Sequence, residues 1–255
     1  MLLKISDKLI GYENEFSTFK KLFTEDKLPK TILLEGQRGI GKFTFATHLI
    51  NFFLSKVKTD IFDNINKNTN VTILNKNEKD KEYKIEEVRK IINLCNLKIS
   101  EDKPHFVLIK DINFLNNNSV NALLKIIEEQ KNNIFFIFSA NSAASLSETL
   151  KSRLFVQKLF LKRCYYKQII NNYLFENNIE ENFELQDFET PGLQIRCFLS
   201  SNITDMNFLK KENEEFFYNI FSKKLLGRKN MLSNLKKLKL NLALKNDIKF
   251  MFKKY

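Results

Sequence analysis

The segment GQRGIGKFT, residues 36–44, is the feature that most constrains how this chain can fold. It spells G-x-x-x-x-G-K and stands between an apolar run, TILLE (31–35), and a helical pattern that begins at Lys42. Three of the chain's six glycines lie inside it: Gly36, Gly39 and Gly41. The N–H groups of such a loop and of the following helix form an anion site, in which Lys42 would reach the outer phosphates of a nucleotide. The context predicts a phosphate-binding loop (P-loop), and a glycine-rich turn without a ligand is the alternative.

The residues expected to hold a metal ion beside this loop are missing. Phe43 follows Lys42 at the position where the motif has a Ser or Thr whose hydroxyl ligates Mg²⁺. Thr44 comes one residue later, and a helix rotates by about 100° per residue, so its hydroxyl should point elsewhere. A later strand ends in Asp111, but Ile112 follows in place of a second acid that would orient an attacking water. We therefore expect no metal site and no ATP hydrolysis, while binding of ATP or ADP through this degenerate site stays open.

Five short runs, nearly continuous in apolar residues, have the pattern of strands in a parallel sheet that is covered on both faces. These runs are 31–35, 71–74, 105–110, 134–139 and 154–160. Helical patterns separate them, and the clearest covers residues 117–129, with Asn118 or Ser119 available as its N-cap. Alternating strands and helices predict an α/β, doubly wound fold over residues 1–160.

Composition narrows the class of protein further. The chain of 255 residues is 43% hydrophobic and 28% charged, as globular proteins are. No apolar run approaches the ~18 residues that a membrane span needs. Three widely spaced cysteines form no zinc motif and suit a reducing compartment, so we expect a cytoplasmic protein. The net charge of +12 favours an acidic partner, with DNA the first candidate, although lysines abundant throughout the chain would produce the same charge without one.

Beyond residue 160 the strand signal fades and helical patterns dominate. We expect a small helical domain over residues 161–205 and a helical, lysine-rich C-terminal region over 206–255. The amphipathic spacing of leucines in the last region suggests packing against helices of this chain or of a partner. A solvated basic face is the alternative for its lysines.

Several segments of the first 160 residues together resemble the bacterial DNA polymerase III clamp-loader subunits, which are AAA+ proteins. The combination is specific: LIGYENEFSTFKKLFTEDKLPKTILLEGQRGIGK (9–42), IEEVRKI (85–91), HFVLIKDINFL (105–115), NALLKIIEE (121–129) and TLKSR (149–153). The resemblance implies a P-loop domain with a five-stranded parallel sheet and helices on both faces, a helical lid and a C-terminal collar. Among these subunits the chain most resembles delta-prime, which often lacks the hydroxyl or the second acid and tolerates the loss of the family's zinc-binding cysteines.

The resemblance also assigns roles to residues. Arg153, preceded by Ser152, matches the arginine that projects into a neighbouring subunit's ATP site and stabilises charge on the transferred phosphoryl group. A surface arginine at a strand edge is the alternative. Asn141 is a candidate polar sensor, and Arg196 a weaker candidate for a second sensor in the lid.

Three functions compete. The first is a delta-prime-like subunit that hydrolyses no ATP, lends Arg153 to a neighbour and helps load the sliding clamp onto primed DNA within a hetero-oligomeric ring. The second is an active motor ATPase of the gamma/tau type, in which Thr44 and Asp111 suffice for Mg²⁺. The third is a basic DNA-binding protein that uses residues 206–255 and no nucleotide.

Overall fold

The computed structural model describes residues 7–54, 60–76, 82–96, 103–129, 133–176, 190–193 and 195. Backbone contacts divide the chain into two compact units, residues 1–172 and 173–255. The predicted regions 161–205 and 206–255 lie largely outside the described residues, as does Arg196, and the division between them stays a prediction.

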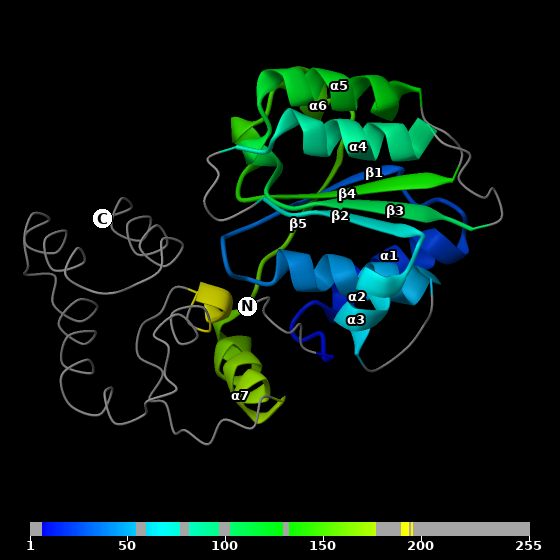
Figure 1. Cartoon of the computed structure of the whole chain (residues 1–255). Helices are drawn as coiled ribbons and strands as arrows, with labels where there is room; N and C mark the ends of the chain where they lie inside the picture. The colour runs from blue at the N-terminus through cyan, green and yellow to red at the C-terminus, as the bar shows by residue number, and fades with distance from the viewer. Residues whose placement is uncertain are drawn as a thin grey trace, which may run out of the picture. The chain divides into compact units, whose positions relative to one another are not determined.

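The first unit alternates strands and helices, as the sequence pattern predicts (Figure 1). Its helices are α1 (Glu13–Thr24), α2 (Lys42–Leu54), α3 (Ile61–Lys67), α4 (Ile85–Asn96), α5 (Asn117–Glu128) and α6 (Glu148–Lys151), and α7 (Tyr166–Glu176) begins in it. Short 3₁₀ helices are η1 (Ile112–Phe114), η2 (Ala143–Ser145) and η3 (Arg163–Tyr165). The strands are β1 (Thr31–Glu35), β2 (Val71–Leu74), β3 (His105–Ile109), β4 (Ile134–Ala140) and β5 (Phe155–Lys158).

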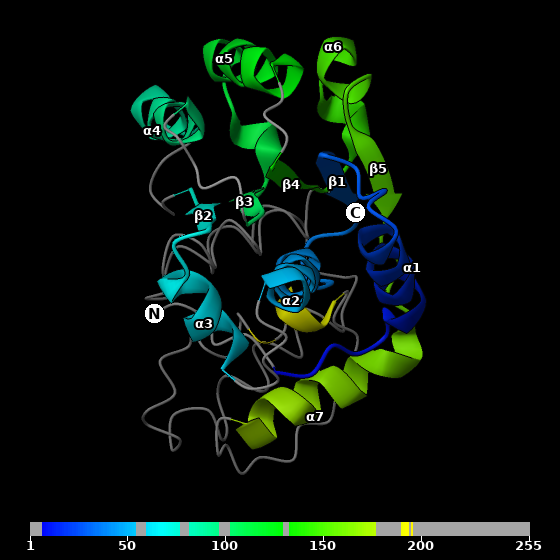
Figure 2. The same cartoon turned by 90° about the vertical axis from the view of Figure 1, so that its right-hand side faces the viewer.

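The five strands form one parallel sheet in the order β2-β3-β4-β1-β5. Helices α4, α5 and α6 cover one face of the sheet, and α1, α2 and α3 cover the other, as Figures 1 and 2 show. The α/β fold with helices on both faces is therefore confirmed. Within the described residues, no helix is long and apolar enough to span a membrane.

The two faces of the sheet carry separate hydrophobic clusters because successive side chains of a strand point to opposite faces. On β1, Leu33 packs with the residues of α4 and α5, whereas Ile32 and Leu34 pack with those of α1, α2 and α3. All three are fully buried. This alternation explains why the central strands β1, β3 and β4 are apolar at most consecutive positions.

The edge strand β5 departs from the buried strand predicted at 154–160. Its residues Phe155 and Val156 are 43% and 37% exposed, because β5 pairs only with β1 within the described sheet. The apolar run therefore predicted the strand correctly but predicted its burial wrongly.

The N-cap predicted for α5 was also wrong. Asn116, and not Asn118 or Ser119, caps the helix, since its side-chain Oδ1 accepts a hydrogen bond from the Ser119 N–H at 2.9 Å. Ser119 is fully buried inside the first turn. The cap stands two or three residues earlier than the local pattern suggested.

Candidate functional site

The P-loop leaves the sheet at the carboxyl end of β1 and enters α2. At Gly36 a side chain would lie 2.6 Å from Ile40 Cδ1 and 2.7 Å from the Leu159 carbonyl oxygen, so only glycine fits there. Gly39 and Gly41 have φ of +85° and +93°, in the left-handed region that glycine adopts without strain. The glycines singled out in the sequence therefore shape the loop directly.

A buried tyrosine holds the middle of this loop. The hydroxyl of Tyr12, just before α1, donates to the Ile40 carbonyl oxygen at 2.8 Å. Burial is the main cause that raises the pKa of Tyr12 above its usual range, followed by the charge of Glu15. The hydroxyl therefore stays protonated and remains a donor to the loop.

Lys42 lies inside the loop and not in solvent, with 6% of its surface exposed. Its Nζ donates to the carbonyl oxygens of Gly36 and Gln37, at 2.7 and 2.9 Å, and to Asn141 Oδ1 at 3.1 Å. The fold thus brings together two residues of the predicted site that are 99 positions apart, Lys42 and Asn141. Through them the ammonium joins the start of α2 to the end of β4.

Lys42, with the backbone of Gly39 and Gly41, forms the part of the site that fits the phosphates of ATP or ADP. Loop N–H groups and one ammonium suit an anion. A bound nucleotide would supply phosphoryl groups to the loop N–H groups, and Lys42 would contact them by exchanging one of its three present acceptors for a phosphoryl oxygen. Thr44 is half-buried in the first turn of α2. Its Cβ would lie 3.9 Å from a Cβ added to Gly41.

The metal side of the site has the wrong chemistry for Mg²⁺. Lys110, directly after β3, places its Nζ 5.4 Å from the centroid of the Phe43 ring. An aromatic ring and an ammonium therefore face each other beside the P-loop, where Mg²⁺ would require hard oxygen ligands. Within the described residues, no group of three His, Cys, Asp or Glu side chains forms a metal site. These residues do not fit a magnesium ion.

Asp111, two residues after the end of β3, interacts with Ser139 of β4 and with Tyr83. Its backbone has φ of +52°, and its N–H donates to Ser139 Oγ at 2.9 Å. The pKa of Tyr83 is raised, first by burial and second by the negative charge of Asp111. Tyr83 therefore senses the charge of the Asp111 carboxylate. Ile112, which replaces the expected second acid, is buried in the hydrophobic cluster beneath α4 and α5.

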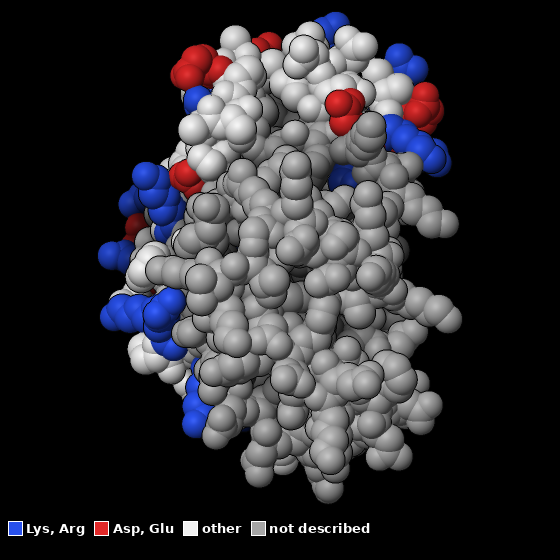
Figure 3. All heavy atoms as spheres, turned by 90° about the vertical axis from the view of Figure 1, so that its left-hand side faces the viewer, with Lys and Arg blue, Asp and Glu red and all other residues white. Residues whose placement is uncertain are grey.

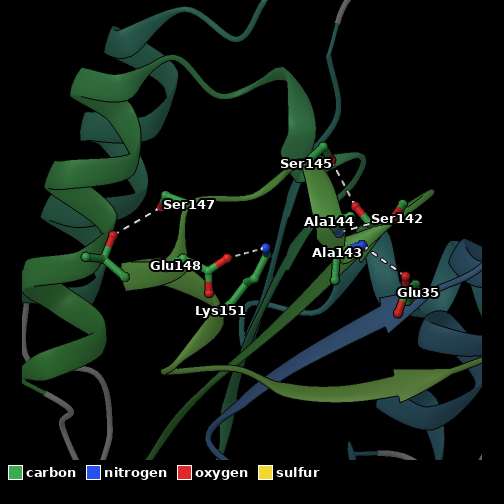
Figure 4. A network of polar contacts seen from close by, with 9 residues as sticks. Glu35, Ser142, Ala143, Ala144, Ser145, Ser147, Glu148 and Lys151 are labelled. Atoms are coloured by element: carbon green, nitrogen blue, oxygen red, sulfur yellow. Dashed lines mark hydrogen bonds and ion pairs between the residues drawn. The ribbon is translucent and has the colours of Figure 1, made fainter.

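The segment from β4 to α6 leads into the arginine motif, and polar contacts fix it to the end of β1 and within itself (Figure 4). Glu35, at the end of β1, accepts a hydrogen bond from the Ala143 N–H at 3.0 Å. The Ser142 side chain caps η2 by accepting from the Ala144 N–H at 3.2 Å. Lys151 then pairs with Glu148 within α6 at 2.8 Å.

Arg153 follows α6 and makes three contacts through its guanidinium. Nη1 donates to the Thr149 carbonyl oxygen at 2.8 Å and to Ser152 Oγ at 3.2 Å. Nη2 lies 2.6 Å from Oε1 of Glu128, at the end of α5. Ser152 Oγ itself donates to the Thr149 carbonyl oxygen at 3.0 Å. The predicted pair of Ser152 and Arg153 is therefore joined by a hydrogen bond.

The backbone of Arg153 lies at the opposite end of β1 from the P-loop. Thr31 Oγ1, at the first residue of β1, donates to the Arg153 carbonyl oxygen at 2.6 Å. Two residues later Phe155 pairs with Ile32 in the parallel register. The P-loop follows the other end of the same strand, whose five residues span roughly 15 Å. The fold does not bring Arg153 and Lys42 together in one chain.

Sequence reasoning missed two charged residues of these sites, Lys110 and Glu128. Both contacts join segments that are distant in the chain, and no spacing within either segment signals them. The one available signal was membership of Glu128 in the NALLKIIEE motif, since a functional motif includes residues that support the reactive group.

The sequence family described as DNA polymerase III, delta subunit, matches residues 11–163, which is more than half of the chain. The chain belongs to the DNA polymerase III clamp-loader family. The matched region contains the P-loop, the whole sheet and Arg153. The family predicted from the sequence motifs is thereby confirmed.

Two curated relatives are gamma-type subunits. The chain is 27% identical over 154 residues to DNA polymerase III subunit gamma of Buchnera aphidicola, an alignment of 57% of this chain and 42% of the relative. It is 27% identical over 153 residues to the gamma/tau subunit of Mycoplasma genitalium, with 56% of this chain and 25% of the relative aligned. The chain thus matches less than half the length of either.

Solved structures of other proteins share the fold. A DNA polymerase III gamma subunit-related protein of Thermotoga maritima superposes with a TM-score of 0.53 at 16% identity, covering 92% of this chain and 69% of that one. A mutant of RuvB from the same organism gives 0.55 at 18% identity, covering 88% and 73%. The likeness to these proteins supports the AAA+ type of fold.

Proposed function

We propose that this clamp-loader subunit is delta-prime-like: it assists ATP hydrolysis at a neighbouring subunit and hydrolyses none at its own P-loop. The observation that carries the proposal is the position of Arg153. It is partly exposed at the start of β5, and the length of β1 separates it from its own P-loop. An arginine so placed stabilises charge on a transferred phosphoryl group only if another chain binds that group.

The degenerate P-loop supports the second half of the proposal. Phe43 offers no oxygen to a metal ion, and the ammonium of Lys110 lies over its ring. A cation at this place opposes the entry of Mg²⁺ by charge repulsion. Lys42 and the loop backbone retain the means to hold phosphates, so nucleotide here would be bound without being cleaved.

The partners follow from the family. We propose that the chain joins ATP-hydrolysing clamp-loader subunits in a hetero-oligomeric ring in the cytoplasm. That ring acts on the sliding clamp and on primed DNA. The net charge of +12 suits the DNA component of this assembly.

Reconstitution tests the proposal. ATP turnover is measured for this chain alone, for the gamma-type subunits of the same organism alone, and for the co-purified mixture. We expect background turnover from this chain, and turnover of the mixture above the sum of its parts. Turnover by this chain alone at the rate of the gamma-type subunits would contradict the proposal.

A second candidate function is a motor ATPase, favoured by the similarity to gamma-type relatives. In that case Thr44 and Asp111 must together serve Mg²⁺ despite Phe43. The candidate predicts nucleotide binding that depends on Mg²⁺ and is lost in Thr44→Ala. Titration calorimetry with ATP, in Mg²⁺ or in EDTA, separates the two functions, since the delta-prime-like subunit binds equally in both.

A further inference from the structure

The ion pair between Arg153 and Glu128 indicates that a second residue contributes to the function of the arginine. We propose that Glu128 is a positioning residue, which holds the guanidinium of Arg153 in one orientation before a neighbouring subunit binds. This inference rests on the proposed function of Arg153 in trans. It assigns a role to an acidic residue that lies 25 positions earlier, at the end of α5.

Glu128 is held by a well-anchored helix. Asn116 caps the start of α5, and Leu123, Ile126 and Ile127 bury one side of it against the sheet. The side chain of Glu128 emerges in the last turn and is 51% exposed. Its carboxylate therefore starts from a fixed backbone, although its end lies in solvent.

Arg153 is fixed from a different direction. Leu150 of α6 is buried, the N–H of Arg153 donates to the Leu150 carbonyl oxygen at 3.1 Å, and Thr31 binds the Arg153 carbonyl oxygen. The carbonyl oxygen of Thr149 accepts a hydrogen bond from Nη1 of the guanidinium, and the carboxylate of Glu128 pairs with Nη2. Two elements that are separate in the sequence thus converge on one side chain.

The contacts leave the arginine able to act on a ligand. None of its three contacts uses Nε, and the side chain is 37% exposed, so N–H groups remain for a phosphoryl oxygen. A long side chain normally loses rotamer freedom when it binds, and this loss opposes catalysis. If Glu128 orders Arg153 in advance, the neighbour's site does not bear that cost. An exposed ion pair adds little to folding stability. We therefore expect the loss of Glu128 to change the rate of ATP hydrolysis and not the stability of the subunit.

The experiment uses the reconstituted assembly with ATP as substrate. Glu128→Ala removes the carboxylate, Glu128→Gln keeps an oxygen that can accept from Arg153, and Glu129→Ala serves as the matched control. Glu129 is the adjacent residue, is also exposed, and donates its backbone N–H to the Lys125 carbonyl oxygen. Assembly is checked for each variant by co-elution with the gamma-type subunits.

We expect Glu128→Ala to lower kcat roughly fivefold with little change in KM, because the arginine acts on the transition state. Glu128→Gln should fall between Ala and wild type, and Glu129→Ala should stay within about twofold of wild type. In an Arg153→Ala background, Glu128→Ala should have no further effect, which a general structural defect would not reproduce.

Other results overturn the inference. If Glu128→Ala leaves kcat unchanged or raises it, Glu128 does not position the arginine. An equal loss in the Arg153→Ala background would show that Glu128 acts independently of Arg153. If Arg153→Ala alone leaves turnover unchanged, the proposed function fails and the positioning role fails with it, whereas the first two results leave the proposed function intact.

Discussion

Lys42 has a structural role at the residue scale that needs no nucleotide. Its buried ammonium donates to two loop carbonyl oxygens and to Asn141. A buried charge without partners is costly, so these oxygens stabilise both the lysine and the loop around it. The residue that would bind phosphates in this fold also closes its own loop.

Replacement of Lys42 should therefore destabilise the chain without any ligand. We expect Lys42→Met to lower the free energy of unfolding by about 2 kcal/mol, because three acceptors lose a charged donor. Urea unfolding followed by circular dichroism measures the change. Lys162→Met, at an exposed lysine before η3, is the control and should unfold with the wild type. Equal stability of all three proteins would show that Lys42 contributes nothing to the fold.

Phe43 illustrates what a sequence can predict about a site and what it cannot. The loss of a metal ligand at this position is evident from the residue type alone. The ammonium of Lys110 over its ring is not, because the contact depends on where β3 ends relative to α2. Local chemistry was predictable here, and the tertiary contact was not.

At the scale of elements, α5 joins its N-terminal cap after β3 to a contact with the arginine motif. Its N-cap, Asn116, fixes the first turn, and its last turn presents Glu128 to Arg153. The cap was misassigned from the sequence because four consecutive polar residues, 116–119, offer several candidates. The extended backbone of Asn116 and the hydrogen bond that its side chain accepts from the Ser119 N–H decide between them.

Loss of the α5 cap should destabilise the helix. We expect Asn116→Ala to lower the free energy of unfolding by about 1 kcal/mol, since the Ser119 N–H loses its acceptor. Asn117→Ala, one residue later and exposed, is the matched control and should change stability little. Thermal unfolding of the two variants provides the comparison, and equal midpoints would contradict the assignment of the cap.

The strands show the same division between local and tertiary information. Continuous apolar runs located all five strands, because a parallel sheet covered on both faces needs apolar residues at successive positions. The same rule predicted a buried β5, yet Phe155 and Val156 are exposed. An apolar segment does not reveal that its strand forms the edge of a sheet, because the order of strands is a property of the whole fold.

At the scale of the whole molecule, the two ends of one sheet have different proposed functions: one binds nucleotide and the other acts on a neighbouring subunit. The carboxyl ends of the strands carry the P-loop, and the start of β5 carries Arg153. On the described part of the face that Figure 3 shows, Lys and Arg line the left margin, and Asp and Glu lie among further Lys and Arg at the upper end. This arrangement suits a subunit that contacts different partners through different surfaces.

The central claim is that this chain acts on ATP bound by another subunit, and turnover of the assembly with Arg153→Ala tests it most directly. Steady-state hydrolysis is compared among assemblies that contain wild type, Arg153→Ala or Arg163→Ala, an exposed arginine of η3. Co-elution establishes that each variant assembles. We predict a loss of at least ~10-fold for Arg153→Ala and wild-type turnover for Arg163→Ala, from the size of arginine-finger effects. Unchanged turnover in a fully assembled Arg153→Ala complex would contradict the account.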